Sequence, residues 1–125
     1  MGLQLEVRER ILCPDYYCVV HAVLEAVLQK IGITQIEEVE EHVKKLAELI
    51  TDEGYLDDEY TFTVFRELEV TIYRINYEVD ECYPEGCEGS LTVKFEVNGD
   101  TGSIKQIVKK LLKEIGADMY VKVCE

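Results

Sequence analysis

The sequence predicts a single α+β domain with an antiparallel or mixed four-stranded sheet and helices on one face. Three observations support this prediction: both ends of the chain alternate apolar with polar residues, three segments repeat apolar residues at helical spacing, and two alternating segments flank a Pro-Gly turn. The expected order is β-α-α-β-β-α-β, a ferredoxin-like variant in which the two early helices count as one crossover. With 125 residues, the chain has the size of one domain, 1–125.

The first strand and the first helix are marked by their apolar pattern and by their ends. Leu3–Val7 alternates with polar residues, as in a half-buried strand. Asp15 is a good N-cap and Gly32 is a natural residue after a helix, so a helix is expected over Tyr16–Ile31. This helix is apolar on most sides, which favours burial inside the fold or between two copies of the chain.

A second helix follows, and then an acidic loop. Thr34–Glu37 fits a capping box, and apolar residues continue at helical spacing to Ile50. The other face of this helix is charged, so His42, four residues after Glu38, is expected in solvent. Asp52 to Glu59 is expected to be a loop.

The pattern of the second half of the chain predicts two strands, a helix and a final strand. Apolar residues keep one parity from Tyr60 to Ile72 and then change phase, which predicts a bulge near Tyr73 and Arg74. Cys82–Cys87 encloses a β-turn, and Leu91–Val97 returns antiparallel. A capping box at 103–106 begins a third helix, and 119–123 alternates as a final strand.

Charge and composition exclude several classes of function. The chain has 13 basic and 26 acidic residues, a formal net charge of −13. It therefore has few cations with which to bind a nucleic-acid backbone or anionic lipid. No apolar run is long enough to span a membrane, and Met1–Arg10 is too charged for a signal peptide, so we expect a cytoplasmic protein. Abundant Glu and Lys with few Asn and Gln are typical of hyperthermophiles.

The cysteines have unusual spacing. Cys13 and Cys18 have four residues between them, as do Cys82 and Cys87, and His21 follows Cys18 by about one helical turn. Two such pairs can supply four thiolates to zinc, with His21 in reserve, because zinc favours tetrahedral sulfur and imidazole ligands. A lone histidine in an apolar helix is also typical of a hydrogen-bonded core residue. The candidate metal ligands are Cys13, Cys18, His21, Cys82 and Cys87.

Two local disulfides are the alternative to a metal. Cys82 and Cys87 would face each other across a hairpin, and a bridge from Cys13 to Cys18 would bind the helix start to the preceding loop. Such short loops constrain the unfolded chain little, so their stabilisation is modest. Hyperthermophile cytosols permit structural disulfides. Cys124 has no partner in this pattern.

A third interpretation is thiol chemistry at Cys13. Cys13 precedes Pro14 between a strand and a helix N-terminus, where the helix dipole stabilises a thiolate. This strand–Cys–Pro–helix order resembles that of the TusA-like sulfur carriers, with Tyr16 in place of that family's second proline. The resemblance implies a thiol or sulfur-transfer protein with Cys13 as nucleophile, and Cys18 would then be the resolving thiol.

The acidic charge is concentrated in one part of the chain. Residues 52–88 hold 12 acidic and two basic residues. Such a surface can dock a basic protein, or mimic nucleic acid toward a nucleic-acid-binding protein. The lysines at 105, 109, 110 and 113 form an opposite pole that permits head-to-tail association. The candidate partner surface consists of Asp52, Glu53, Asp57, Asp58 and Glu59.

Together these features favour a small acidic binding or regulatory protein that is not an enzyme. Its cysteine pairs are expected to be structural, with zinc as the only candidate cofactor, and its acidic surface is expected to meet a protein partner or a second copy. The alternatives are the thiol-transfer protein and a small-ligand sensor. The sensor would have a pocket between the Tyr16–Ile31 helix and the sheet. Its tyrosines could line such a pocket or fill core and interface positions; they include Tyr16, Tyr17, Tyr73, Tyr77 and Tyr83.

Overall fold

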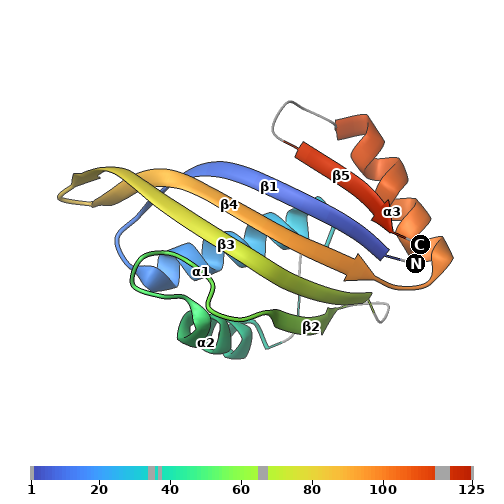
Figure 1. Ribbon diagram of the computed structural model, residues 1–125, viewed down its shortest axis with the longest axis horizontal. Helices are drawn as coiled ribbons and strands as arrows, with labels where there is room; N and C mark the ends of the chain where they lie inside the picture. The colour runs from blue at the N-terminus through green and yellow to red at the C-terminus, as the bar shows by residue number, and fades with distance from the viewer. Residues whose placement is uncertain (1, 34–35, 37, 65–67, 115–118, 125) are drawn as a thin grey trace.

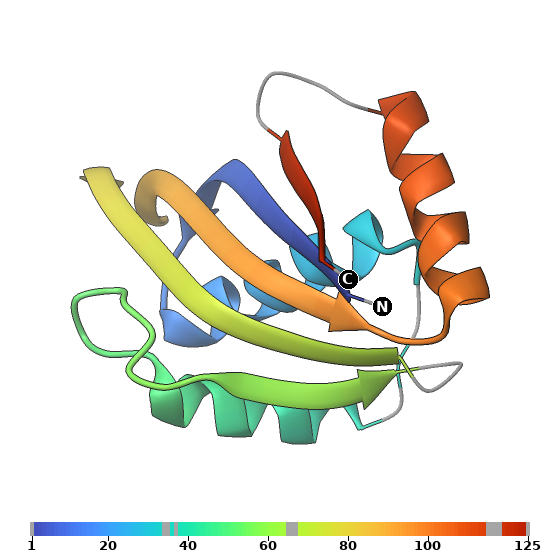
Figure 2. The ribbon, with the colours of Figure 1, turned by 45° about the vertical axis from the view of Figure 1, so that its right-hand side comes forward.

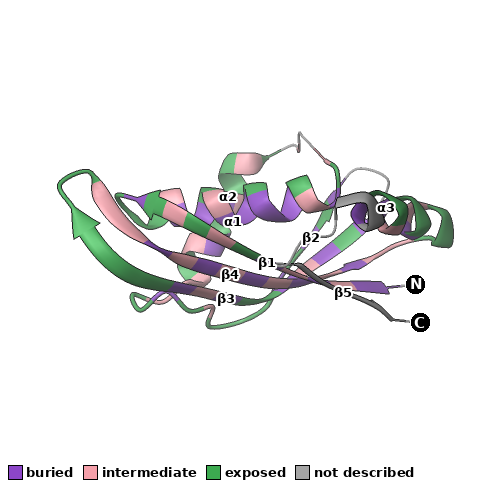
Figure 3. Cartoon of the chain, turned by 90° about the horizontal axis from the view of Figure 1, so that it is seen from above, coloured by how far each residue is buried: buried purple, intermediate pink, exposed green. Residues whose placement is uncertain are grey.

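The computed structural model describes residues 2–33, 36, 38–64, 68–114 and 119–124, with side chains as far as Leu111. In these residues, five strands form one antiparallel sheet in the order β2-β3-β4-β1-β5. Three helices lie on the same side of this sheet (Figure 3). The elements are β1 (Gly2–Cys13), α1 (Tyr16–Lys30), α2 (Val39–Leu49), β2 (Tyr60–Val64), β3 (Leu68–Tyr83), β4 (Gly86–Asn98), α3 (Thr101–Glu114) and β5 (Met119–Cys124).

The α+β class and the antiparallel sheet are confirmed, and the sheet has one strand more than the sequence predicts. The segment expected to run as one strand from Tyr60 is divided into β2 and β3, and Val64 pairs with Leu68. Residues that face each other in an antiparallel pair point to the same side of the sheet. The parity of the apolar residues is therefore the same in β2 and at the start of β3, and alternation alone could not show the division.

The predicted bulge is present in β3. The register between β3 and β4 shifts between Ile72 and Arg74, and the apolar side of β3 moves from Ile72 to Ile75. A second shift, between Val79 and Glu81, was not predicted. The first shift keeps the apolar residues of the long strand on the helix side of the sheet, because Ile75 and Tyr77 are buried after it as Ile72 is before it.

The first helix has the ends that the sequence predicts. Asp15 is its N-cap, and the chain leaves it through Ile31 and Gly32, whose φ is +79°. α1 packs against β1 and β4 on one side and against α2 on another. Its buried residues include Val20, Val23 and Val27. The chain itself therefore covers the apolar faces of this helix, without a second copy.

The other helix starts differ from expectation. α3 begins at Thr101, before the predicted capping box, because the Asp100 carboxylate accepts a hydrogen bond from the Ser103 N–H at 2.7 Å. α2 begins at Val39, and the capping box predicted at positions 34–37 lies mostly outside the described residues.

The expectation that His42 is solvated is wrong. His42 is half-buried, its Nδ1 lies 2.5 Å from the hydroxyl oxygen of Tyr60, and its ring centroid lies 5.2 Å from that of Phe62. The helical pattern placed His42 on the charged face of α2, but it could not show that β2 packs beside that face.

The strands β1, β3 and β4 are much longer than β2 and β5. β1 continues past the predicted Val7 to Cys13, because its second half pairs with the residues of β4 from Cys87 to Thr92. These three strands form an extended end of the sheet, at which α1 begins (Figure 1). The first and last described residues, which pair as Gly2 with Cys124, lie at the opposite end.

Candidate functional site

The first disulfide joins the last residue of β1 to the first turn of α1. Cys13 and Cys18 are bonded, and their Cα atoms are 5.4 Å apart, within the usual range for a disulfide. Between them, the Asp15 carboxylate accepts a hydrogen bond from the Cys18 N–H at 3.0 Å. The cap sets the direction of the helix, and the disulfide ties that helix to the strand.

The second disulfide closes the hairpin between β3 and β4. Cys82 and Cys87 are bonded across the two strands, with Cα atoms 4.0 Å apart. The turn between them includes Gly86, whose φ is +147°. The disulfide interpretation of both cysteine pairs is therefore confirmed.

The two disulfides meet at the same end of the sheet. Cys87 pairs in register with Cys82 on β3 and with Cys13 on β1, so three cysteines form one row across three adjacent strands. Cys18 is bonded to the end of that row. Cys13 is buried at 5% exposure, whereas Cys82 is exposed and Cys18 and Cys87 are intermediate. We call these four residues the cysteine row.

A pocket of about 400 Å³ lies beside the cysteine row. It is bounded by the start of α1, by the loop between α2 and β2, and by the ends of β3 and β4. Its apolar lining comes from both the helix and the sheet, and carboxylates lie at its edge. The lining residues are Cys13, Pro14, Asp15, Tyr16, Val19, Asp52, Glu53, Gly54, Tyr77, Val79 and Cys87.

The loop on one side of the pocket is held in place by hydrogen bonds. The Tyr16 hydroxyl donates to the carbonyl of Asp52, and the Tyr77 N–H donates to the carbonyl of Gly54 at 3.0 Å. Gly54 has a φ of +87°, and a Cβ there would lie 2.7 Å from the Tyr77 carbonyl oxygen. Only glycine fits this close approach. Figures 1 and 2 show the loop reaching toward the start of α1.

Tyr77 links the pocket to the second disulfide. Its ring is buried, and its hydroxyl donates a hydrogen bond to the carbonyl of Cys87 at 2.5 Å. Burial raises the pKa of Tyr77, and the carboxylates of Asp80 and Glu88 raise it further. Tyr77 is therefore a neutral hydrogen-bond donor at physiological pH.

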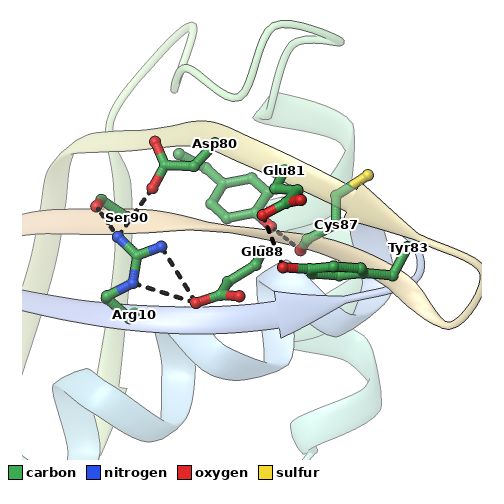
Figure 4. Close-up of polar contacts among 8 residues, drawn as sticks. Arg10, Asp80, Glu81, Tyr83, Cys87, Glu88 and Ser90 are labelled. Atoms are coloured by element: carbon green, nitrogen blue, oxygen red, sulfur yellow. Dashed lines mark hydrogen bonds and ion pairs between the residues drawn. The ribbon is translucent and has the colours of Figure 1, made fainter.

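Arg10 offsets part of the acidic charge on the open face of the sheet. Its guanidinium lies 2.8 Å from Asp80 and 3.2 Å from Glu88 (Figure 4). Hydrogen bonds to these two carboxylates raise the pKa of Arg10. Beyond this cluster, the Tyr83 hydroxyl donates to Glu81, which raises the pKa of Tyr83. The hairpin beside the second disulfide thus keeps a negative surface.

Other sequence-predicted residues are distributed around this site. Asp52 and Glu53 lie at the edge of the pocket, whereas Asp57, Asp58 and Glu59 are exposed on the segment that leads to β2. His21 is exposed on α1. Within the described residues, no group of three or more His, Cys, Asp or Glu side chains is placed to hold a metal ion. With Cys13 in a disulfide, the structure shows no free thiol at the helix start.

The pocket was predicted only in outline. The expected location between the first helix and the sheet agrees with the structure, and of the five candidate tyrosines Tyr16 and Tyr77 line the pocket. The other three, Tyr17, Tyr73 and Tyr83, do not line it. Val19, Gly54 and Val79 were missed as lining residues. The glycine inside the acidic loop was the one available signal, because an isolated glycine often marks a close backbone approach.

No family model, curated protein or solved structure matches this chain. In the described residues, no helix is long and apolar enough to cross a membrane.

Proposed function

We propose that this protein is a non-enzymatic binding protein that docks a basic protein partner at the end of the sheet that holds the cysteine row. The two disulfides hold the elements that form this end. The pocket receives an apolar side chain of the partner, and the acidic residues at and beyond its edge bind flanking basic residues.

This proposal rests on the position of the large apolar side chains that remain exposed. Among the described side chains, six of the seven large apolar residues that remain exposed belong to elements around this end, and Tyr17 is 59% exposed. Clusters of exposed aromatic and aliphatic residues mark interaction surfaces. The six are Leu12, Tyr16, Tyr17, Tyr55, Val79 and Tyr83.

The charge at this end selects the partner. Asp52 and Glu53 border the pocket, and Asp57, Asp58 and Glu59 continue the acidic surface along the same loop. A negatively charged surface beside an apolar pocket favours a ligand that has both an apolar group and positive charge. A basic peptide with one leucine or aromatic residue has this chemistry.

A titration followed by amide NMR tests the proposal with a defined probe. A lysine-rich peptide containing one leucine should shift the amide signals of Val19, Gly54 and Tyr77, more strongly at low salt. The variant D52N/E53Q should weaken binding at least about threefold, because it removes two charge pairs. The variant E25Q/E40Q, which changes the net charge equally on exposed helix positions, should leave binding unchanged. Absence of shifts at the pocket, or equal weakening by both variants, would exclude this docking site.

A small-ligand sensor is a second candidate, supported by the volume of the pocket. About 400 Å³ lies within the range of small-molecule sites, and the acidic edge suits an organic ammonium ion. Benzylammonium should then raise the melting temperature of the protein, and D52N/E53Q should abolish that rise. A response to benzylammonium without a response to the peptide would favour the sensor.

Three finer assignments are proposals as well. The order β5-β1-β4-β3, with β2 added at the edge, supports a ferredoxin-like variant. A composition typical of hyperthermophiles supports a cytoplasmic location, because their cytosols permit disulfides. The four cysteines at one end of the sheet support zinc as the alternative to disulfides, because their reduced thiols would be zinc ligands. Native mass spectrometry before and after denaturation distinguishes bound zinc from the mass loss of two disulfides.

A further inference from the structure

We propose that the cysteine row is a site of thiol–disulfide exchange, which oxidises the dithiol of a positively charged partner. The Cys82–Cys87 disulfide reacts first, at the exposed Cys82, and Cys87 then exchanges with the Cys13–Cys18 disulfide at the buried Cys13. Cys13 and Cys87 also line the proposed pocket, but this inference does not depend on docking there, because its test follows disulfide pairing and not binding.

The register of the sheet supports exchange between the two disulfides. Cys87 has a cysteine directly opposite it on each neighbouring strand, Cys82 on β3 and Cys13 on β1. Directly opposed residues in antiparallel strands have Cα atoms about 4.5–5.5 Å apart, which is within disulfide range. Cys87 can therefore bond to either neighbour without a change in strand pairing.

The exposure of the cysteines sets the order of events. Cys82 is exposed at the hairpin, whereas Cys13 is 5% exposed. An external thiol therefore reaches Cys82 before it reaches Cys13. Cys13 is therefore reached chiefly from inside the protein, through Cys87, whereas Cys18 has intermediate exposure.

The exchange consists of three successive attacks of a thiolate on a disulfide sulfur. A thiolate of the external dithiol attacks the Cys82 Sγ, forms a mixed disulfide and releases the Cys87 thiolate. The Cys87 thiolate attacks the Cys13 Sγ, forms a Cys13–Cys87 bond and releases the Cys18 thiolate. The second external thiol then attacks the mixed disulfide and releases Cys82. The partner leaves as a disulfide, and Cys18 and Cys82 take up its two electrons and two protons.

Charge around the hairpin selects the thiol. The segment 78–88 holds five carboxylates and no basic residue, and of the described basic side chains only Arg10 is paired with it. This field repels anionic thiols and attracts cationic ones. The partner is therefore a basic protein with a dithiol, and anionic low-molecular-weight thiols are poor reductants of this site.

Mapping the disulfides after partial reduction tests the exchange. The C124S protein is treated with limiting dithiothreitol, quenched with acid, alkylated and digested for mass spectrometry. The proposal expects a peptide pair linked through Cys13 and Cys87, with Cys18 and Cys82 alkylated. The same reduction in urea should not favour this pair, because the strand register is lost. Alkylation of Cys82 and Cys87 with Cys13–Cys18 intact, and no cross-strand pair, would overturn the exchange.

A variant gives the same test without a reductant. In C82S/C124S, Cys87 has lost its partner Cys82 and can attack the Cys13–Cys18 disulfide, so the purified protein should contain the Cys13–Cys87 pair and a free Cys18. A folded variant that keeps only Cys13–Cys18 would contradict the proposal, and the wild-type mapping decides the question if the variant does not fold.

Matched monothiols test the choice of partner. Cysteamine, which is cationic, should reduce the Cys82–Cys87 disulfide severalfold faster than 2-mercaptoethanesulfonate, which is anionic, after correction for their thiolate fractions. The ratio should approach one at high salt, where the field is screened. Equal rates at low salt would overturn the assignment of a basic partner.

Discussion

A glycine at the hairpin turn should be essential for the contact between the hairpin and β1. Gly86 has a φ of +147°, and a Cβ there would lie 2.8 Å from the carbonyl carbon and oxygen of Cys13 and 2.9 Å from the Pro14 nitrogen. All three are backbone atoms, which cannot move aside as a flexible side chain does. The substitution G86A therefore combines backbone strain with a clash.

The magnitude follows from these two costs. A backbone conformation that only glycine adopts easily costs another residue about 1–3 kcal/mol. Overpacking against fixed atoms costs about 1–3 kcal/mol more. We expect G86A to lower the free energy of unfolding by about 2–6 kcal/mol, which corresponds to a fall of roughly 6–30 °C in Tm for a domain of this size.

The matched control is the same substitution in α3. A Cβ on Gly102 would meet only an Asp100 carboxylate oxygen, at 3.4 Å, and alanine is the better helix former. G102A should therefore raise the free energy of unfolding by up to about 1 kcal/mol. Both variants are measured by urea denaturation with intact disulfides. A free energy of unfolding of G86A within about 0.5 kcal/mol of the wild-type value would contradict the clash at Gly86. A change of stability in the same direction in both variants would also contradict it.

Three further predictions concern the cap, the disulfides and Tyr77. D15A should lower the free energy of unfolding by about 1 kcal/mol, because the Cys18 N–H loses its acceptor, and D57N serves as an exposed control. Full reduction of the two disulfides should lower the free energy of unfolding by about 2 kcal/mol for each disulfide, since each closes a short loop. An unchanged urea midpoint after reduction would contradict this expectation. Y77F should cost about 1 kcal/mol at pH 7, because the Cys87 carbonyl loses its donor. Because the pKa of Tyr77 is raised in the folded protein, the stabilisation that Tyr77 provides is complete below its unfolded pKa near 10. That stabilisation is lost as pH rises through the folded pKa of Tyr77. The stability gap between wild type and Y77F should therefore narrow above pH 10, and a gap that widens there would exclude this account of Tyr77.

Local signals in the sequence predicted the features that depend on neighbouring residues. Asp15 and Gly32 mark the ends of α1, because capping is a contact between residues a few positions apart. The change of phase after Ile72 predicted the bulge, because a bulge shifts the parity within one strand. For the same reason both cysteine pairs were recognisable as candidates for disulfides, although their spacing left zinc ligation open as well.

Features that depend on distant residues could not be read in the same way. The cysteine row exists because β1 and β4 pair in a register that places Cys13 opposite Cys87, and nothing near either residue specifies that register. His42 was misplaced because its partners, Tyr60 and Phe62, come from β2. The pocket needs residues from separate segments, so the sequence could not show which two of the five candidate tyrosines, Tyr16 and Tyr77, line it.

The position of β1 in the sheet has a consequence for how the chain folds. β1 precedes the other four described strands along the chain but lies between β4 and β5, and its partners extend as far as Cys124. At about 5–20 residues per second, synthesis of the intervening chain takes several seconds, and the apolar side of β1 cannot find its strand partners during that time. Such a high contact order implies folding in milliseconds to seconds after the last strand is available. β1 is therefore unpaired until β4 is made, and its other edge stays open until β5 is made, so truncation before residue 119 should expose an unpaired edge on β1.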